Sequence, residues 1–313
     1  MRTRRMGSVM AIAMCLAGVG MVSAGVLRED MKFEDRSVVI LLPEHYEKGN
    51  DLLPLVLHLD GGSPTFLPGN PADGELGNSG YRDIPSQFNV IVAAPSALPH
   101  PLFPFYSWNF TEECCALPDS AVPDDVGFLN RLLDALLLNY PVDPRRVYLY
   151  GYSAGAAMAY RLACDHTGRF AALVSGAGQF PVQDPGRCAP SAPISVLEVH
   201  SLDDETIPFG GGTFPFNPTL AFPGAIALME YWADHNGCVG ELKFGEEPTV
   251  DLTFLVEGKE TTINTFKQCP HGLDVELWSM QGVPHIPLFF RVGPNGMKPL
   301  AEKSWKFLRS HTR

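Results

Sequence analysis

The sequence has few basic residues and no recognisable set of metal ligands. Its 313 residues include 23 Lys and Arg against 35 Asp and Glu, which gives a formal net charge of −12 at pH 7. An acidic surface repels nucleic-acid phosphates and anionic lipid headgroups, so we expect neither as a partner. The spacings C-x-x-C and H-x-x-x-H do not occur, and we therefore predict neither a metal nor another cofactor.

Internal repeats, low-complexity linkers and an appended module are also lacking. Because 45% of the residues are hydrophobic, one large domain with a sizeable core is expected. The most apolar stretch, residues 9–22, follows three Arg and precedes the small-residue sequence Val22-Ser23-Ala24. This pattern is typical of a secretory signal peptide, and an uncleaved N-terminal anchor is the alternative. We predict a signal peptide over residues 1–24 and a single domain over residues 25–313, in a secreted or periplasmic protein without a membrane anchor.

Export changes the interpretation of the cysteines. Six of the seven remain after the predicted cleavage, and an even number in an oxidising compartment predicts disulfides. The short-range pairs are Cys164 with Cys188 and Cys238 with Cys269. Cys114 and Cys115 are left as a vicinal pair or with partners elsewhere.

Continuous apolar runs alternate with stretches of helical periodicity along the chain. The runs are typical of strands that helices cover on both faces, and the alternation predicts an α/β fold with a mostly parallel central sheet. The predicted strands are residues 37–42, 55–59, 90–94, 146–150, 194–199 and 275–278, and the predicted helices are residues 124–139, 156–163 and 300–308. Residues 209–223, rich in Gly, Pro and Phe, are predicted as an irregular loop that forms a lid or a substrate wall.

A pentapeptide between a predicted strand and a predicted helix carries the strongest functional signal. It reads Gly151-Tyr-Ser153-Ala-Gly155, and G-x-S-x-G in this context is the nucleophile elbow of an α/β-hydrolase. The turn is so tight that the residues two before and two after the Ser must be very small. The alternative is an ordinary Gly-bracketed turn with a surface Ser.

A nucleophilic Ser needs a His base and a carboxylate that orients the base. In this fold the chain order is Ser, acid, His, and Ser153 is followed by Asp203 and Asp204 after one strand and by His285 after the last. Because the carboxyl ends of parallel strands share one edge of the sheet, these residues are expected to meet there. The spacing does not choose between Asp203 and Asp204, and His271 is the alternative base.

The negative charge that develops on the ester oxygen needs backbone N–H donors. One is expected from Ala154, which follows the nucleophile, and the other from the Gly-Gly turn after an early strand, where we predict Gly62. The alternative for Gly62 is an ordinary turn. The aromatic loop over residues 96–123 predicts either a ring-binding pocket or plain loop packing for Trp108 and its Phe neighbours.

These features occur together with several further short sequence motifs, and the motifs follow one another in the order found in a known family. The chain resembles the secreted polyhydroxybutyrate depolymerase and feruloyl esterase-like group of α/β-hydrolases over about residues 36–285. In that group the acid lies in His-Gly-x-x-Asp-x-x-x-Pro-Tyr-x-Gly, and the matching stretch here, which begins at His200, places the acid at Asp204. The other matching motifs are Val126-Gly-Phe-Leu129, Val142-Asp-Pro-Arg-Arg-Val147, Met158-Ala-Tyr-Arg-Leu-Ala-Cys164 and Gly282-Val-Pro-His285. Tyr152 and Ser201 differ from the usual residues, so the resemblance predicts the reaction and leaves the ester open.

The resemblance implies an exported serine esterase that acts through an acyl-enzyme, with catalytic Ser153, Asp204 and His285. The substrates that it implies are feruloyl or acetyl esters of polysaccharides, or short polyhydroxyalkanoate esters, as small molecules or polymers. The alternatives are a serine peptidase on the same fold and a non-catalytic hydrolase-like binding protein.

Overall fold

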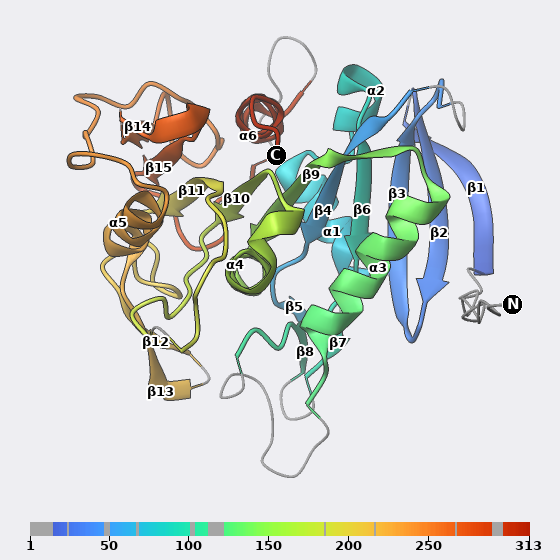
Figure 1. Cartoon of the computed structure of the whole chain (residues 1–313), viewed down its shortest axis with the longest axis horizontal. Helices are drawn as coiled ribbons and strands as arrows, with labels where there is room; N and C mark the ends of the chain where they lie inside the picture. Colours follow the sequence, from blue (N-terminus) through green and yellow to red (C-terminus); the bar gives the residue numbers. More distant parts are fainter. Residues whose placement is uncertain are drawn as a thin grey trace, which may run out of the picture.

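A ten-stranded sheet runs through the centre of the molecule (Figure 1). The structure is a computed structural model that describes residues 15–23, 25–46, 51–66, 69–100, 104–111, 122–184, 186–215, 217–266, 268–289 and 297–313. The strand order is β1-β2-β3-β6-β4-β9-β10-β11-β15-β14. The bounds of these strands are β1 Cys15–Ser23, β2 Val26–Phe33, β3 Arg36–Pro43, β4 Leu53–Leu59, β6 Ile91–Pro95, β9 Val142–Tyr152, β10 Ala172–Gly176, β11 Ser195–Ser201, β14 Thr261–Thr265 and β15 Val275–Met280.

The central part of the sheet is parallel and its edges are antiparallel. The strands from β6 to β15 pair in parallel, whereas β1, β2 and β3 at one edge and β14 at the other pair antiparallel. The carboxyl ends of the parallel strands therefore lie at one edge, as the predicted fold requires. Two small sheets accompany it, one formed by β5 Ser63–Pro64, β7 Leu98–Pro99 and β8 Phe105–Ser107, the other by β12 Gly212–Phe214 and β13 Asn217–Phe222.

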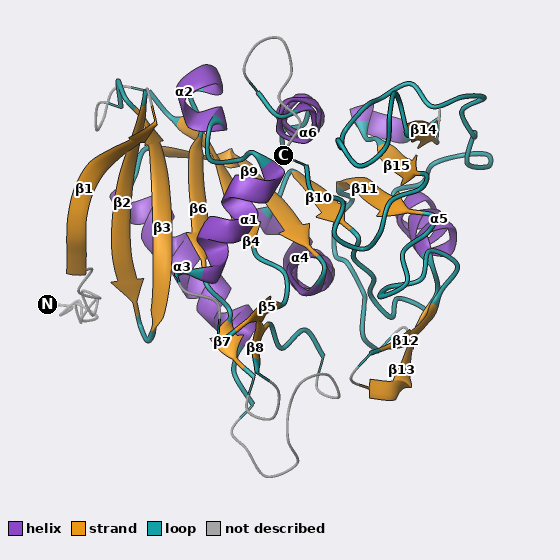
Figure 2. Cartoon of the chain, turned by 180° about the vertical axis from the view of Figure 1, so that it is seen from behind, coloured by secondary structure: helices purple, strands orange, loops and turns teal. Residues whose placement is uncertain are grey.

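Helices cover both faces of the sheet (Figure 2). Alternate residues of a strand point to opposite faces, so Leu55 and Leu57 of β4 belong to the core on the face covered by α3, α4 and α5, while Val56 belongs to the core on the face covered by α1, α2 and α6. The helices are α1 Pro71–Ser79, α2 Ile84–Phe88, α3 Asp125–Asn139, α4 Ala154–His166, α5 Ala225–His235 and α6 Pro299–Arg309, with the 3-10 turns η1 Thr167–Arg169 and η2 Pro270–Gly272. The predicted α/β class is thereby confirmed.

Helix α3 illustrates how closely the local sequence determines an element. The Asp124 carboxylate accepts a hydrogen bond of 2.8 Å from the Gly127 N–H, which caps the helix at the residue where the sequence predicts its start. The buried side chains include Leu129, Leu132 and Leu136, and their spacing of three and four residues forms one apolar face.

All the predicted strands and helices are present, and several elements were missed. The antiparallel strands β2 and β14, the short parallel strand β10 and the helices α1, α2 and α5 were not predicted. The predicted irregular loop over residues 209–223 contains the hairpin of β12 and β13. Strand β1 lies within the predicted signal peptide and pairs with β2; cleavage after residue 24 stays a prediction.

The described residues contain two disulfides, and both are the predicted short-range pairs. Cys164 of α4 pairs with Cys188, and Cys238 pairs with Cys269. Cys114 and Cys115 lie outside the described residues.

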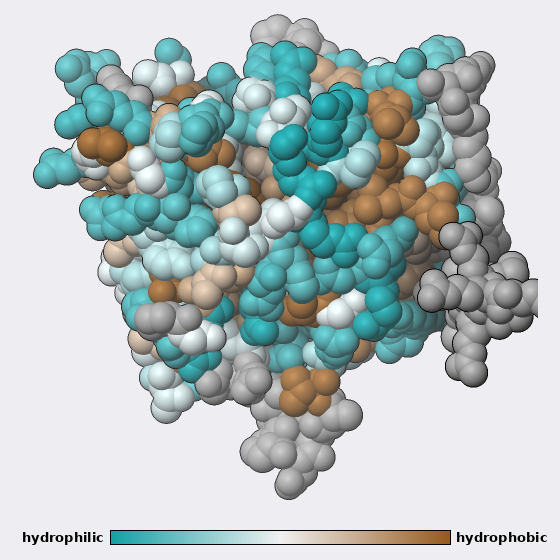
Figure 3. Space-filling model, viewed as in Figure 1, coloured by the Kyte–Doolittle hydropathy of each residue, from teal (hydrophilic) through white to brown (hydrophobic). Residues whose placement is uncertain are grey.

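The face seen in Figure 1 is mostly hydrophilic, with a hydrophobic area near the end of α3 (Figure 3). Among the helices that the structure describes, none has the length and apolar character to cross a membrane.

Candidate active site

Ser153 lies in a strained turn between β9, which ends at Tyr152, and α4, which begins at Ala154. Its φ of 50° and ψ of −116° are unusual for a residue with a side chain. A Cβ atom on Gly151 would lie 2.3 Å from the Gly155 carbonyl oxygen, and one on Gly155 would lie 2.3 Å from the Leu59 carbonyl oxygen. Both positions therefore require Gly, because the helix passes this close to the strands.

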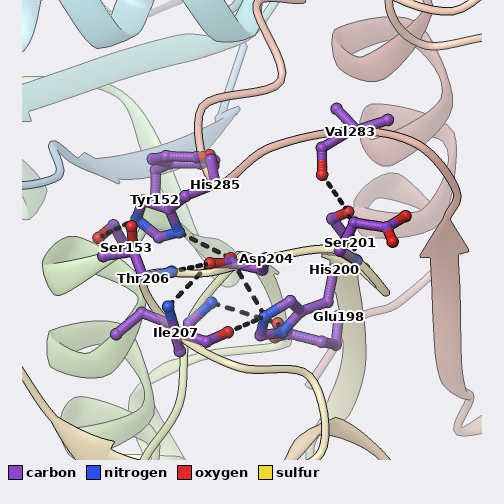
Figure 4. Close-up of polar contacts among 12 residues, drawn as sticks. Tyr152, Ser153, Glu198, His200, Ser201, Asp204, Thr206, Ile207, Val283 and His285 are labelled. Carbon is purple, nitrogen blue, oxygen red and sulfur yellow. Dashed lines mark hydrogen bonds and ion pairs between the residues drawn. The ribbon is translucent and has the colours of Figure 1, made fainter.

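The three predicted catalytic side chains lie in one hydrogen-bonded chain (Figure 4). The Ser153 Oγ is 3.0 Å from the His285 Nε2, and the His285 Nδ1–H donates to the Asp204 Oδ2 at 2.7 Å. With the proton on Nδ1, the Nε2 lone pair faces the Ser153 hydroxyl and can take its proton. The Asp204 Oδ1 accepts hydrogen bonds from the backbone N–H groups of Thr206 and Ile207 at 2.9 and 2.8 Å, which fix the carboxylate.

The alternatives for the acid and the base lie elsewhere. Asp203 is exposed, and its Oδ2 accepts a hydrogen bond of 2.6 Å from the Gly282 N–H, in the loop that carries His285. His271 lies in η2, which precedes β15, whereas His285 follows it. The structure thus brings Asp204, rather than Asp203, to His285, in agreement with the register of the family resemblance.

A buried ion pair lies behind the Asp204 carboxylate. The His200 Nδ1 is 3.0 Å from the Glu198 Oε1, and its Nε2 donates to the Ile207 carbonyl oxygen at 2.8 Å and is 3.4 Å from the Asp204 Oδ2. The side chains of Glu198, His200 and Asp204 are fully buried. Burial disfavours the charged imidazole, but hydrogen bonds to Asp204 and Glu198 outweigh it and raise the pKa of His200 to about 9.

The pKa of Asp204 changes in the opposite direction for related reasons. Burial favours the protonated carboxyl, but hydrogen bonds from His200 and His285 outweigh burial and hold the pKa of Asp204 well below its usual range. Asp204 is therefore ionised, so that a negative charge faces His285 when this imidazole takes up a proton.

Two hydroxyl groups fasten the loop that carries His285 (Figure 4). The Tyr152 hydroxyl donates to the His285 carbonyl oxygen, and the Ser201 hydroxyl donates to the Val283 carbonyl oxygen. Tyr152, at the end of β9, directly precedes Ser153, and Ser201, at the end of β11, lies three residues before Asp204. The strand ends that carry the nucleophile and the acid therefore also hold the loop of the base in position.

A largely apolar cavity of about 290 Å³ opens at Ser153. Its lining comes from the two small sheets, from the segment after β8 and from the loops after β4, β9, β10, β11 and β15. The lining residues are Gly62, Pro64, Phe105, Ser107, Phe110, Ser153, Ala154, Gln179, Thr206, Ile207, Phe214, Pro215 and His285. Trp108, in contrast, is fully buried and donates a hydrogen bond of 2.9 Å to the Asp60 carbonyl oxygen. The aromatic loop therefore supplies both predicted roles, a pocket wall and loop packing.

Both predicted oxyanion donors line the same cavity. Ala154 is the first residue of α4, so its N–H has no carbonyl partner within the helix and lies at the positive end of the helix dipole. Gly62 lies in the loop after β4. The oxyanion role of both groups stays a prediction. Within the described part of the chain, no three His, Cys, Asp or Glu side chains are grouped as metal ligands.

The chain is similar in sequence or in fold to proteins named as esterases. No protein-family model matches the chain. It is 35% identical over 162 residues to the putative esterase NocK of Nocardia uniformis subsp. tsuyamanensis, which spans 50% of this chain and 46% of that protein. It is 30% identical over 141 residues to feruloyl esterase B of Piromyces equi, over 44% of this chain and 25% of that protein. The solved acetyl xylan esterase of Aspergillus awamori superposes with a TM-score of 0.58 at 14% identity, over 88% of this chain and 94% of that one.

The chain has the α/β-hydrolase fold. It spans about half the length of the first of these relatives and a quarter of the second. The resemblance to feruloyl esterase-like α/β-hydrolases is confirmed by these relatives. The polyhydroxybutyrate depolymerase part of the resemblance stays a prediction.

Some residues of this α/β-hydrolase site were not identified from the sequence. Glu198 could have been found, because it is the one charged residue in the predicted strand over residues 194–199. Gln179 follows β10, a strand that was not predicted, and Phe214 lies in the expected irregular loop. No sequence signal connects these two residues to Ser153.

Proposed function

We propose that the chain is a serine carboxylic-ester hydrolase that acts through an acyl-enzyme. The observation that supports this most directly is the hydrogen-bonded chain from Ser153 through His285 to Asp204 beside an apolar cavity. The names of the relatives, putative esterase and feruloyl esterase, support the same reaction.

In the proposed first half-reaction, the Ser153 Oγ forms a bond to the ester carbonyl carbon while its proton passes to the His285 Nε2. Asp204 stabilises the resulting imidazolium. The N–H groups of Ala154 and Gly62 hold the negative oxygen of the tetrahedral intermediate. The intermediate collapses, the C–O bond to the alcohol breaks, and His285 gives its proton to the departing oxygen.

In the second half-reaction, water attacks the acyl carbon and transfers a proton to His285. The bond to the Ser153 Oγ breaks as that oxygen regains a proton, and the carboxylic acid leaves. Both steps use only groups of the chain and water.

The proposed substrates are feruloyl or acetyl esters of polysaccharides, or short polyhydroxyalkanoate esters. The apolar walls of the cavity and the name of the Piromyces relative favour the feruloyl group. We also propose that residues 1–24 are a signal peptide and that the protein is exported. The two disulfides support export, because disulfides persist in oxidising compartments.

Hydrolysis of a short chromogenic ester tests the reaction. We expect Ser153→Ala to lower kcat by about 10⁶-fold and Asp204→Asn by about 10⁴-fold. Asp203→Asn is the matched control, because its amide oxygen can still accept the hydrogen bond from Gly282, and it should retain most of the activity. Ester hydrolysis that survives Ser153→Ala would contradict the proposal, and hydrolysis of a matched amide without ester turnover would favour the peptidase.

A further inference from the structure

His200 has both of its ring nitrogens against hydrogen-bond acceptors. Its Nδ1 is 3.0 Å from the Glu198 Oε1, and its Nε2 is 2.8 Å from the Ile207 carbonyl oxygen. Both oxygens of Glu198 accept further hydrogen bonds, Oε2 from the Tyr160 hydroxyl at 2.8 Å and Oε1 from the Gly178 N–H at 3.2 Å. Such donors favour the ionised carboxylate. A neutral imidazole has a single N–H, so only the imidazolium form of His200 satisfies both acceptors.

This imidazolium lies directly behind the carboxylate that orients the base (Figure 4). The Asp204 Oδ2 accepts a hydrogen bond from the His285 Nδ1–H at 2.7 Å and is 3.4 Å from the His200 Nε2. The same carboxylate oxygen therefore lies between two imidazole rings. Because the side chains of His200 and Asp204 are fully buried, solvent ions screen the attraction between them only weakly.

His200 also holds the backbone that carries the acid. The Ile207 carbonyl oxygen accepts a hydrogen bond from His200, while the Ile207 N–H donates to the Asp204 Oδ1 at 2.8 Å. The Phe209 ring packs edge-on against the imidazole, with 5.7 Å between the ring centroids. The segment from Asp204 to Phe209 thus wraps around the His200 ring, and the position of this ring determines the position of the carboxylate.

We propose that His200 is a positioning residue that, as an imidazolium paired with Glu198, fixes Asp204 and sets the acidic limit of the pH range in which the triad works. Its positive charge balances part of the charge of Asp204 and opposes the formation of a second positive charge on His285, so the base stays available at lower pH. This inference rests on the proposed ester hydrolysis and adds the residues that adjust the same site to pH.

The charges around His200, apart from that of His285, stay constant between about pH 5 and pH 8. Against the effect of burial, hydrogen bonds to Asp204 and Glu198 raise the pKa of His200 to about 9. Burial raises the pKa of Tyr152 and of Tyr160 well above 10, so both stay neutral. The titratable groups that face His200, directly or through a carboxylate, are Glu198 of β11, Asp204 of the following loop, Tyr160 of α4, Tyr152 of β9 and His285 of the loop after β15.

The test measures kcat/KM for a short chromogenic ester against pH, because the acidic limb of this profile reports protonation of the base in the free enzyme. The double variant Glu198→Gln and His200→Gln has no charge at either position. The single variant His200→Gln leaves the Glu198 anion without its cation. In both, the Gln at position 200 has an amide N–H that can donate to the Ile207 carbonyl oxygen.

His311→Gln is the matched control. His311 is also buried, and its Nε2 is 3.0 Å from the Asp274 Oδ2. Asp274 directly precedes β15, whereas the catalytic residues follow the ends of their strands, so this pair lies at the opposite edge of the sheet.

We expect the acidic limb to have the same midpoint in the wild type and in His311→Gln. In the double variant the midpoint should move upward by about 0.5 to 1 pH unit, because no cation then balances Asp204. In His200→Gln it should move further in the same direction, because a buried anion remains. KM should change little, since neither Glu198 nor His200 lines the cavity.

The charge of His200 is measured independently by NMR of the nitrogen-labelled protein near pH 7. The wild-type spectrum should contain an imidazole with protons on both nitrogens that is missing from the double variant. The double variant decides the inference if the single variant does not fold, since it leaves no unpaired charge in the core.

A neutral His200 in this spectrum would overturn the inference. So would a double variant that hydrolyses the ester more slowly at every pH but keeps the wild-type midpoint, because His200 would then have only a structural role; in that case the inference fails alone. If the wild type hydrolyses no ester, the proposed function fails. The rate at which an organophosphonate labels Ser153 then replaces kcat/KM in the same pH comparison, and an unchanged midpoint would again overturn the inference.

Discussion

The buried pair of Glu198 and His200 predicts a loss of stability at alkaline pH. The pKa of His200 rises from the ordinary 6.5 to about 9 in the folded protein. A group whose pKa is raised by folding stabilises the protein fully below its unfolded pKa. The stabilisation is lost as the pH rises from about 6.5 through about 9, because the folded state then releases the proton as well.

The magnitude follows from the same difference. The interval from 6.5 to about 9 spans two to three pH units, and each unit corresponds to about 1.4 kcal/mol, so the contribution is about 3 to 4 kcal/mol. A domain of this size changes its melting temperature by roughly 2 °C per kcal/mol. The expected decrease in melting temperature as the pH rises from 6.5 through 9 is therefore about 6 to 8 °C.

The assay is thermal unfolding followed by circular dichroism at several pH values between 6 and 10. The reference is the double variant Glu198→Gln and His200→Gln, in which neither position titrates. In the wild type Tyr160 donates to one oxygen of Glu198 and Gly178 to the other, and the single amide oxygen of a Gln at position 198 can still accept one of these two hydrogen bonds. Because other groups titrate equally in both proteins, their effects cancel in the comparison. Equal decreases in melting temperature for the wild type and the double variant would refute the charged state of His200.

Two further predictions concern stability. Gly155→Ala places a Cβ 2.3 Å from the Leu59 carbonyl oxygen, and we expect it to lower the free energy of unfolding in urea by about 2 kcal/mol or more, with loss of esterase activity. Gly168→Ala, which meets no atom within 4 Å, is its control, and equal effects would contradict the elbow packing. Cys164 and Cys188 are 24 residues apart. Replacing both by Ala should lower the free energy of unfolding by about 3.5 kcal/mol, because the unfolded chain without the disulfide gains conformational entropy. A decrease under about 1 kcal/mol would contradict this stabilising role of the disulfide.

The sequence by itself determined the elements whose cause is local. Helix α3 begins where Asp124 caps it, and the elbow needs Gly151 and Gly155 because of contacts that any tight strand-to-helix turn makes. The elements that were missed have weaker patterns. Strand β10 has only five residues, Ala172–Gly176, and so short an apolar run cannot be distinguished from part of a helix by its periodicity.

The order of the catalytic residues along the chain was also predictable, because parallel strands bring their carboxyl ends to one edge. The direction of each side chain within the loops was not. Asp203 and Asp204 are neighbours in sequence, and from the residues alone they were equivalent until the family register was used. In the structure the Thr206 and Ile207 N–H groups turn Asp204 toward His285, while Asp203 turns to Gly282.

The tertiary structure alone decided which residues surround the nucleophile. Gln179 and Phe214 follow different strands, are far from Ser153 in sequence and meet it only in the cavity. The charge of His200 likewise depends on Glu198 and Asp204 being buried against both sides of one ring. A sequence pattern records which residues a strand or helix can bury, whereas cavity walls and buried ion pairs depend on the relative placement of several loops.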